Sequence, residues 1–191
     1  MNVINGEARE ALTRLKEGEW WPTTPSEREA LATWLTMFTI NHTYALPLAS
    51  PIPADEPKKF MTARRPMPRW SFWVGLLHPE CRWQVGTKHT KTMFFGNTDL
   101  AAGPNSLTLC IPLKRALFMC FRTSTGFSIS AEAAKKYLFL SSIWPMKAWN
   151  MFPSPPLIDD VRAENIAHWM ERPKIWAALV NKPSSAIEYG Q

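Results

Sequence analysis

Residues 70–77 read WSFWVGLL, and their large apolar side chains alternate in the way that is typical of a β-strand. Trp70, Phe72 and Val74 would share one face of this strand, whereas Trp73 would point to the other face. The preceding residues, 61–69, read MTARRPMPR and carry three arginines interrupted by prolines. This composition predicts an exposed loop that leads into a buried strand.

Four later runs also predict short strands. They are residues 81–86 (CRWQVG), 91–97 (KTMFFGN), 107–113 (LTLCIPL) and 116–122 (ALFMCFR). The turns between successive strands are short, and parallel neighbours would need a crossover of about a dozen residues or more, so the pattern favours an antiparallel meander. Pro112 cannot donate a ladder hydrogen bond, which would place the run 107–113 at an edge or at a bulge.

Helix signals precede the predicted sheet. Residues 5–17 have a helical apolar stripe that is followed by a glycine. Thr24, Pro25 and Glu27 have the pattern of a capping box with proline at the first helical position. The second helix should fade near Asn41, because β-branched residues follow one another from position 39.

Helix signals return after the sheet, at Ser130 and at the acidic pair Asp159 and Asp160. Six prolines between residues 47 and 69 predict an extended strap that joins the first helices to the sheet. We therefore expect a single α+β domain over residues 1–182, with an antiparallel meander of about five strands flanked by N-terminal and C-terminal helices. Its parts would be a helical region (1–41), the strap (47–69), the meander (70–122), a second helical region (130–182) and a frayed tail (183–191).

The composition excludes several classes of protein. Of the 191 residues, 46% are hydrophobic and 20% are charged, which suits a folded core. No run approaches the roughly 20 apolar residues of a membrane-spanning helix, and the N-terminus lacks the apolar core of a secretory signal, so no membrane association is expected. Cys81, Cys110 and Cys120 are widely spaced, which favours free thiols in a reducing cytoplasm and argues against a metal site.

Positive charge is concentrated in the middle of the chain. Residues 57–97 carry eight basic side chains and one acid, whereas residues 1–56 carry four basic and eight acidic ones. The basic residues of the middle segment are Lys58, Lys59, Arg64, Arg65, Arg69, Arg82, Lys88 and Lys91. If the fold gathers them, they form a basic patch for phosphate or carboxylate groups, and if it does not, they are scattered solvated charges. Trp73 is the aromatic candidate for base stacking, unless a helix covers it.

These patterns favour a non-enzymatic cytoplasmic protein of binding or inhibitor type. Its partner would be nucleic acid, or a protein surface of similar acidity that is held by protein–protein interaction. No phosphate-binding, dinucleotide-binding or serine-nucleophile motif occurs, so no cofactor and no catalytic residue is expected. The oligomeric state stays open.

The alternative is a small enzyme, of nuclease or transferase type, that acts on a phosphate-containing substrate. His89 lies between two lysines and could act as a general base, and Asp99 follows a predicted strand. A metal-dependent reaction would need a second carboxylate, and Glu80 is the one other acid of the middle segment. The simpler interpretation is a histidine in a hairpin turn and an aspartate in a loop.

Overall fold

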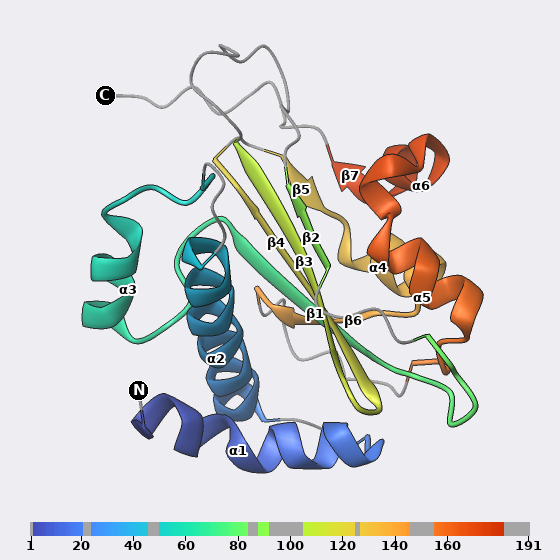
Figure 1. Cartoon of the computed structure of the whole chain (residues 1–191), viewed down its shortest axis with the longest axis horizontal. Helices are drawn as coiled ribbons and strands as arrows, with labels where there is room; N and C mark the ends of the chain where they lie inside the picture. Colours follow the sequence, from blue (N-terminus) through green and yellow to red (C-terminus); the bar gives the residue numbers. More distant parts are fainter. Residues whose placement is uncertain are drawn as a thin grey trace.

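The computed structural model describes residues 2–20, 24–45, 50–83, 88–91, 105–124, 127–145 and 155–181. Within these ranges, five strands form an antiparallel sheet in the order β2-β3-β4-β1-β6 (Figure 1). The strands are β1 (Trp70–Leu76), β2 (Lys88–Lys91), β3 (Ser106–Leu113), β4 (Ala116–Thr123) and β6 (Ser141–Trp144). A second, two-stranded sheet pairs β5 (Ser128–Ile129) with β7 (Val180–Asn181).

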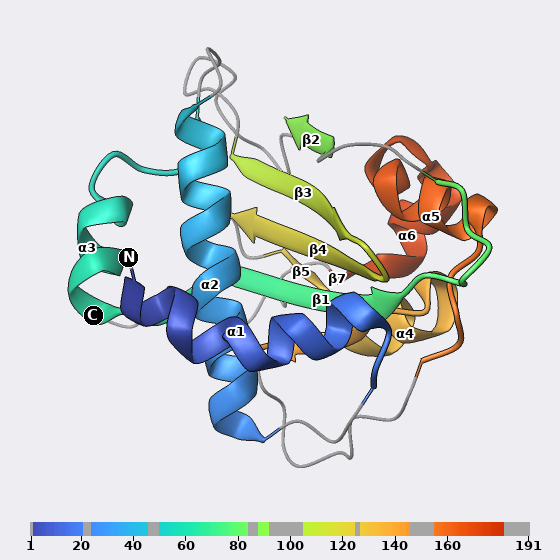
Figure 2. The ribbon, with the colours of Figure 1, turned by 60° about the horizontal axis from the view of Figure 1, so that its bottom comes forward.

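Helices cover both faces of the five-stranded sheet (Figures 1 and 2). The helices before the sheet are α1 (Asn2–Glu17), α2 (Pro25–Tyr44) and α3 (Glu56–Ala63), and those after β4 are α4 (Ala131–Leu138), α5 (Asp160–Ala167) and α6 (Pro173–Leu179). Trp70, Phe72 and Val74 pack with the first group, while Trp73 packs with the second. The alternating side chains of β1 therefore pack into two hydrophobic cores, one on each face of the sheet. The neighbouring strand β4 is buried along its whole length. The predicted α+β class is confirmed.

Local capping signals set the helix boundaries. The Thr24 hydroxyl accepts a hydrogen bond from the Glu27 backbone N–H, and the Glu27 carboxylate accepts one from the Thr24 backbone N–H. The predicted capping box is therefore present. The helix before it begins at Asn2, earlier than predicted, and ends at Glu17, where it is followed by Gly18 with φ of +84°. The α2 helix continues to Tyr44, past Asn41, because its buried last turns pack on the sheet despite their β-branched residues.

The C-terminal helices begin at the predicted residues. Ser130 accepts from the backbone of Ala133, and Asp159 accepts from the backbone of Arg162. A short 3₁₀ segment, Trp169–Glu171, joins α5 to α6. Strands β2, β5, β6 and β7 were not predicted, since each is four residues or shorter. The predicted tail, 183–191, lies outside the described residues.

The proline-rich strap contains a helix, α3, which differs from the predicted extended segment. Pro57 lies in its first turn, where a missing backbone N–H does no harm. Phe60 anchors the helix in the core. At its start, Glu56 is buried against Arg122 of β4, with Nη2 and Oε2 2.7 Å apart, so a buried ion pair joins α3 to the sheet.

The strand order differs from that of a simple meander, although β2, β3 and β4 do follow one another. The segment after β1 leaves the sheet: Leu77 bridges Ile158, and the backbone N–H of Arg82 donates to Asp160 at 2.8 Å. Residues 81–83 are therefore bound to α5 instead of forming the predicted strand. The space beside β1 is taken by β4 on one side and β6 on the other. Of the predicted strand 91–97, only Lys91 lies within the described residues.

Pro112 lies on β3 beyond the stretch that pairs with β2, which ends at Cys110. Among the described residues, no strand pairs with that side of β3 at Pro112, which suits its missing N–H. None of the helices in the described ranges combines the length and the apolar character needed to cross a bilayer.

Candidate functional site

A pocket of about 750 Å³ lies at the end of the sheet where β1 begins and β6 ends. The loop that enters β1 forms one wall and contributes Arg65 and Arg69. Phe127, next to β5, and Trp144, the last residue of β6, contribute aromatic side chains. We call this site the arginine pocket.

The two arginines are held differently. Arg65 is exposed and has no hydrogen bond or ion pair to any other described residue. Arg69 has a left-handed backbone, with φ of 72°, and its Nη1 donates to the carbonyl of Ser124 at 2.8 Å. One guanidinium is thus free to meet a ligand, while the other is positioned by the end of β4 and retains further N–H groups.

Phe127 and Trp144 are both partly exposed, so each can present part of its ring to a ligand. Trp144 packs against the core formed with the N-terminal helices, and Phe127 against the core formed with the C-terminal helices. Glu29 of α2 also lines the pocket, and within the described residues no ion pair joins it to either arginine. The lining therefore combines two cations, one carboxylate and two partly exposed aromatic rings, beside the buried rings of Trp70 and Phe121.

This combination suits a planar anionic ligand. Guanidinium groups donate in pairs to phosphate or carboxylate oxygens. The aromatic rings offer faces on which a base can stack, and a carboxylate can accept from an exocyclic amino group. The pocket is also within the usual size range of small-molecule sites, about 300–1,000 Å³.

Three further predicted cations lie on α3 and at its end. Lys58 and Arg64 are exposed, and Arg64 ends the helix with φ of 49°. Lys59 forms an ion pair with Asp55, with Nζ and Oδ2 2.6 Å apart. This hydrogen bond raises the pKa of Lys59 and lowers the pKa of Asp55. Lys59 is therefore already paired with a carboxylate. Lys58 and Arg64 are exposed cations that shortly precede the pocket residues Arg65 and Arg69 in the sequence.

Arg82 is not part of this group. It follows the far end of β1, and a strand of that length spans roughly 20 Å. In both overall views, α3 and the segment that leads from β1 toward α5 lie on opposite sides of the molecule (Figures 1 and 2). The described structure therefore does not place Arg82 beside the arginines of the loop, because its segment is bound to α5.

Lys88 and Lys91 lie at the two ends of β2, on the sheet edge opposite to β6. The register places Lys91 in one row with Leu107, Arg122 and Trp70, so its backbone is level with the start of β1. Three strand spacings, roughly 14 Å, separate it from β1. Lys91 thus lies at the same end of the sheet as the arginine pocket, and Lys88 lies three residues further along β2.

Trp73 is not available for stacking on a base. It is 1% exposed and belongs to the core formed with the C-terminal helices. The C-terminal helices cover this face of the sheet, so the Trp73 ring lies between the sheet and the helices.

Of the two residues proposed for an enzyme, only His89 lies within the described part of the chain. His89 lies in β2 opposite Leu109, in a strand where a hairpin turn was expected. Asp99 lies outside the described residues. Among the residues that are described, no group of three or more histidine, cysteine, aspartate or glutamate side chains could hold a metal ion.

The cysteines do not resemble activated nucleophiles. All three are free, and burial raises the pKa of the Cys120 thiol. Burial, with hydrogen bonding to Asp160, also raises the pKa of Cys81. A thiolate is the reactive form, so neither environment promotes attack at neutral pH.

Sequence analysis found the arginines of the pocket but missed Phe127, Trp144 and Glu29. Each comes from a separate part of the chain, and only the antiparallel pairing of β1 with β6 brings Trp144 to the loop. The available signal was weak: a single aromatic residue beside a turn at each of the two positions.

No family model matches the chain, and no curated protein or solved structure is significantly similar to it.

Proposed function

We propose that this protein is a non-enzymatic binding protein that holds single-stranded nucleic acid at the arginine pocket. The observation that carries the proposal is that Arg65 and Arg69 line the same pocket as two partly exposed aromatic rings. Proteins that bind single strands combine cations for the backbone with aromatic platforms for the bases.

The surrounding charges support the same partner. Lys58 and Arg64 are exposed and lie within a few residues of Arg65 in the sequence. The backbone of Lys91 lies level with the start of β1. They would extend the positive field along a strand that leaves the pocket. Glu29 would favour a base with an amino group and would disfavour a phosphate at its own position.

The three free thiols are compatible with a cytoplasmic site of action. An inhibitor that occupies an acidic protein surface would use the same arginines. It would have no need of the aromatic rings as stacking platforms, which is why nucleic acid is favoured.

The test is fluorescence anisotropy with a labelled single strand of about a dozen nucleotides, as DNA and as RNA, at about 50 and about 200 mM salt. The expected result is binding that weakens with salt. In Arg65→Ala, the slope of log K against log salt should fall in magnitude by about 0.7, the value for one phosphate contact. Trp144→Ala should cost about 1–3 kcal/mol of binding free energy, and Trp144→Phe should recover part of it.

Arg65 is the better target than Arg69, because the Arg69 side chain also holds the carbonyl of Ser124. The matched control is Lys135→Ala, an exposed cation on α4, on the other side of the sheet. Urea denaturation should show that each variant is folded.

Equal losses in Arg65→Ala and Lys135→Ala would contradict the proposal, because the binding would then follow total charge. If neither DNA nor RNA binds, and polyglutamate binds in an Arg65-dependent way, the partner is an acidic protein surface and the nucleic-acid proposal is wrong.

A further inference from the structure

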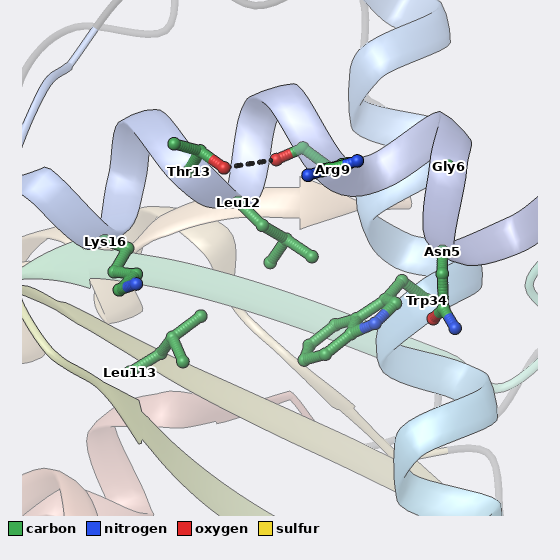
Figure 3. A pocket seen from close by; sticks show the side chains of 8 residues that line it. All are labelled: Asn5, Gly6, Arg9, Leu12, Thr13, Lys16, Trp34 and Leu113. Carbon is green, nitrogen blue, oxygen red and sulfur yellow. Dashed lines mark hydrogen bonds between the residues drawn. The ribbon is translucent and has the colours of Figure 1, made fainter.

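A second pocket, of about 490 Å³, lies between α1, α2 and the end of β3 (Figure 3). Leu12, Trp34 and Leu113 converge on it from these three elements and form an apolar floor. Arg9 and Lys16 line it from α1, and both are exposed. We call this site the α1 pocket.

Among the described residues that line it, the α1 pocket has positive charges and no negative one. No acidic side chain is among its lining residues. Within α1, no acid lies three or four positions from Arg9 or Lys16, where a helical ion pair would form. Of the three acids of the helix, Glu10 pairs with Arg14 at 2.9 Å and Glu17 pairs with Lys114. The hydrogen bond from Lys114 lowers the pKa of Glu17, and the charge of the neighbouring Lys16 also helps to lower it.

Its floor is held in place by contacts that do not involve a ligand. Trp34 stacks on Phe38, with ring centroids 5.3 Å apart. The last turn of α1 is tied to the turn between β3 and β4, since the Arg115 backbone N–H donates to the carbonyl of Lys16 at 3.2 Å. A ligand would therefore meet a largely preformed surface and would lose little affinity to ordering it.

We propose that the α1 pocket binds an amphiphilic organic anion, a carboxylate or sulfonate attached to an aromatic body. The body would lie on Trp34 and the two leucines, and the anion would meet Arg9 or Lys16. The volume suits one small ligand, and offset stacking on an indole is favourable. The site is separate from the arginine pocket and does not depend on the proposed function, since the two share no lining residue.

The test compares two probes of similar shape, the anionic 8-anilinonaphthalene-1-sulfonate and the neutral N-phenyl-1-naphthylamine, by fluorescence titration. The full-length chain should bind the anion more tightly than the neutral amine. Arg9→Ala and Lys16→Ala should each weaken binding of the anion, with about a fivefold loss for a close contact, and leave binding of the amine unchanged.

A blocking variant locates the bound probe. Gly6 is a residue of α1 that lines the pocket. A β-carbon added there would have no neighbouring atom within 4 Å. Gly6→Leu should therefore fill the pocket without destabilising the helix, and should abolish binding of both probes. The indole N–H resonance of Trp34 should shift on binding, while that of Trp144 should not.

Arg65→Glu, in the other pocket, separates this inference from the proposed function, because it removes any anionic probe held at the arginine pocket but should leave the shift of the Trp34 indole resonance unchanged. Equal affinity for the two probes would overturn the inference. So would a shift of the Trp34 resonance that survives Gly6→Leu or that is lost in Arg65→Glu, because the probe would then not be held by the α1 pocket.

Discussion

Gly75 is the residue at which the packing of β1 is tightest. A β-carbon there would overlap Cδ1 of Ile158 and would lie 3.0 Å from the carbonyl oxygen of Phe139. The neighbouring backbone is fixed, because Leu76 and His78 exchange hydrogen bonds with Ile158, both at 2.8 Å. The site therefore has no room for a methyl group.

We predict that Gly75→Ala lowers the free energy of unfolding by about 1–3 kcal/mol, as overpacking of a filled core does. The measurement is urea denaturation followed by far-UV circular dichroism. Gly6→Ala is the matched control: it has open space and lies inside a helix, so it should raise stability by up to about 1 kcal/mol. Effects of the same sign in the two variants would contradict the packing argument.

Cys120 makes stability depend on pH. It is 1% exposed on β4, and burial raises its thiol pKa although the Thr39 hydroxyl donates to Sγ. The folded pKa is above the unfolded one, so the contribution of the protonated thiol is complete below about pH 8.5 and is lost as the pH rises beyond it.

The expected loss is about 1.4 kcal/mol per pH unit for one proton, and Cys120→Ala should remove this part of the slope. Urea denaturation of both proteins under reducing conditions, from neutral pH to about pH 10, measures it. The absolute stability of the variant will be lower because of the cavity, so the comparison is between slopes. Equal slopes would show that the thiol does not titrate between the two states.

At the scale of elements, what could be predicted from the sequence depends on the distance between interacting residues. The capping box at Thr24 and the cap at Ser130 were predicted because both partners lie within three residues. The prolines around α3 predict an extended segment, yet the helix forms, because proline suits a first helical turn. The strand order could not be predicted, because it depends on the pairing of β1 with β4 and β6, which lie far along the chain.

The same distinction applies to the candidate site. Arg65 and Arg69 could be predicted as exposed, since a loop with prolines cannot be buried without partners. Their aromatic neighbours could not, because Trp144 reaches the pocket only through pairing of β6 with β1. The burial of Trp73 could not be predicted either, since it requires helices more than fifty residues further along the chain.

The junction between α3 and the sheet depends on a buried charge. Glu56 and Arg122 are 8% and 3% exposed, and Arg122 Nη1 also donates to the carbonyl of Pro51 at 2.7 Å. The indole N–H of Trp70 donates to the same carboxylate. Glu56 thus receives donors from β1 and from β4 at once.

We predict that Glu56→Gln lowers the free energy of unfolding by about 3–5 kcal/mol, because the Arg122 charge is then buried without a counter-charge. The double variant Glu56→Gln with Arg122→Met should recover a large part of this loss. Asp55→Asn is the control, because it breaks the exposed pair with Lys59 one residue earlier and should have little effect. The measurement is urea denaturation of the wild-type protein, Glu56→Gln, the double variant and Asp55→Asn. If Glu56→Gln is as stable as Asp55→Asn, the prediction is wrong.

At the scale of the whole molecule, the sheet is the shared wall of two cores. Cys120 and Phe118 of β4 belong to the core with α1 and α2, while Met119 and Phe121 belong to the core with α4 and α5. Loss of either helical layer would expose one complete face of the sheet to water. The layers should therefore unfold together, in one transition.

We predict that Leu35→Ala, in α2, and Ile166→Ala, in α5, each lower the free energy of unfolding by about 2–5 kcal/mol, since both side chains are fully buried. Both should shift a single transition that is the same by circular dichroism and by tryptophan fluorescence. Hydrogen exchange of the β4 amides should accelerate in both variants, because the strand is protected only while both layers are folded. A first transition in Ile166→Ala that leaves the β4 amides protected would show that α1, α2 and the sheet form a unit able to fold without the C-terminal helices.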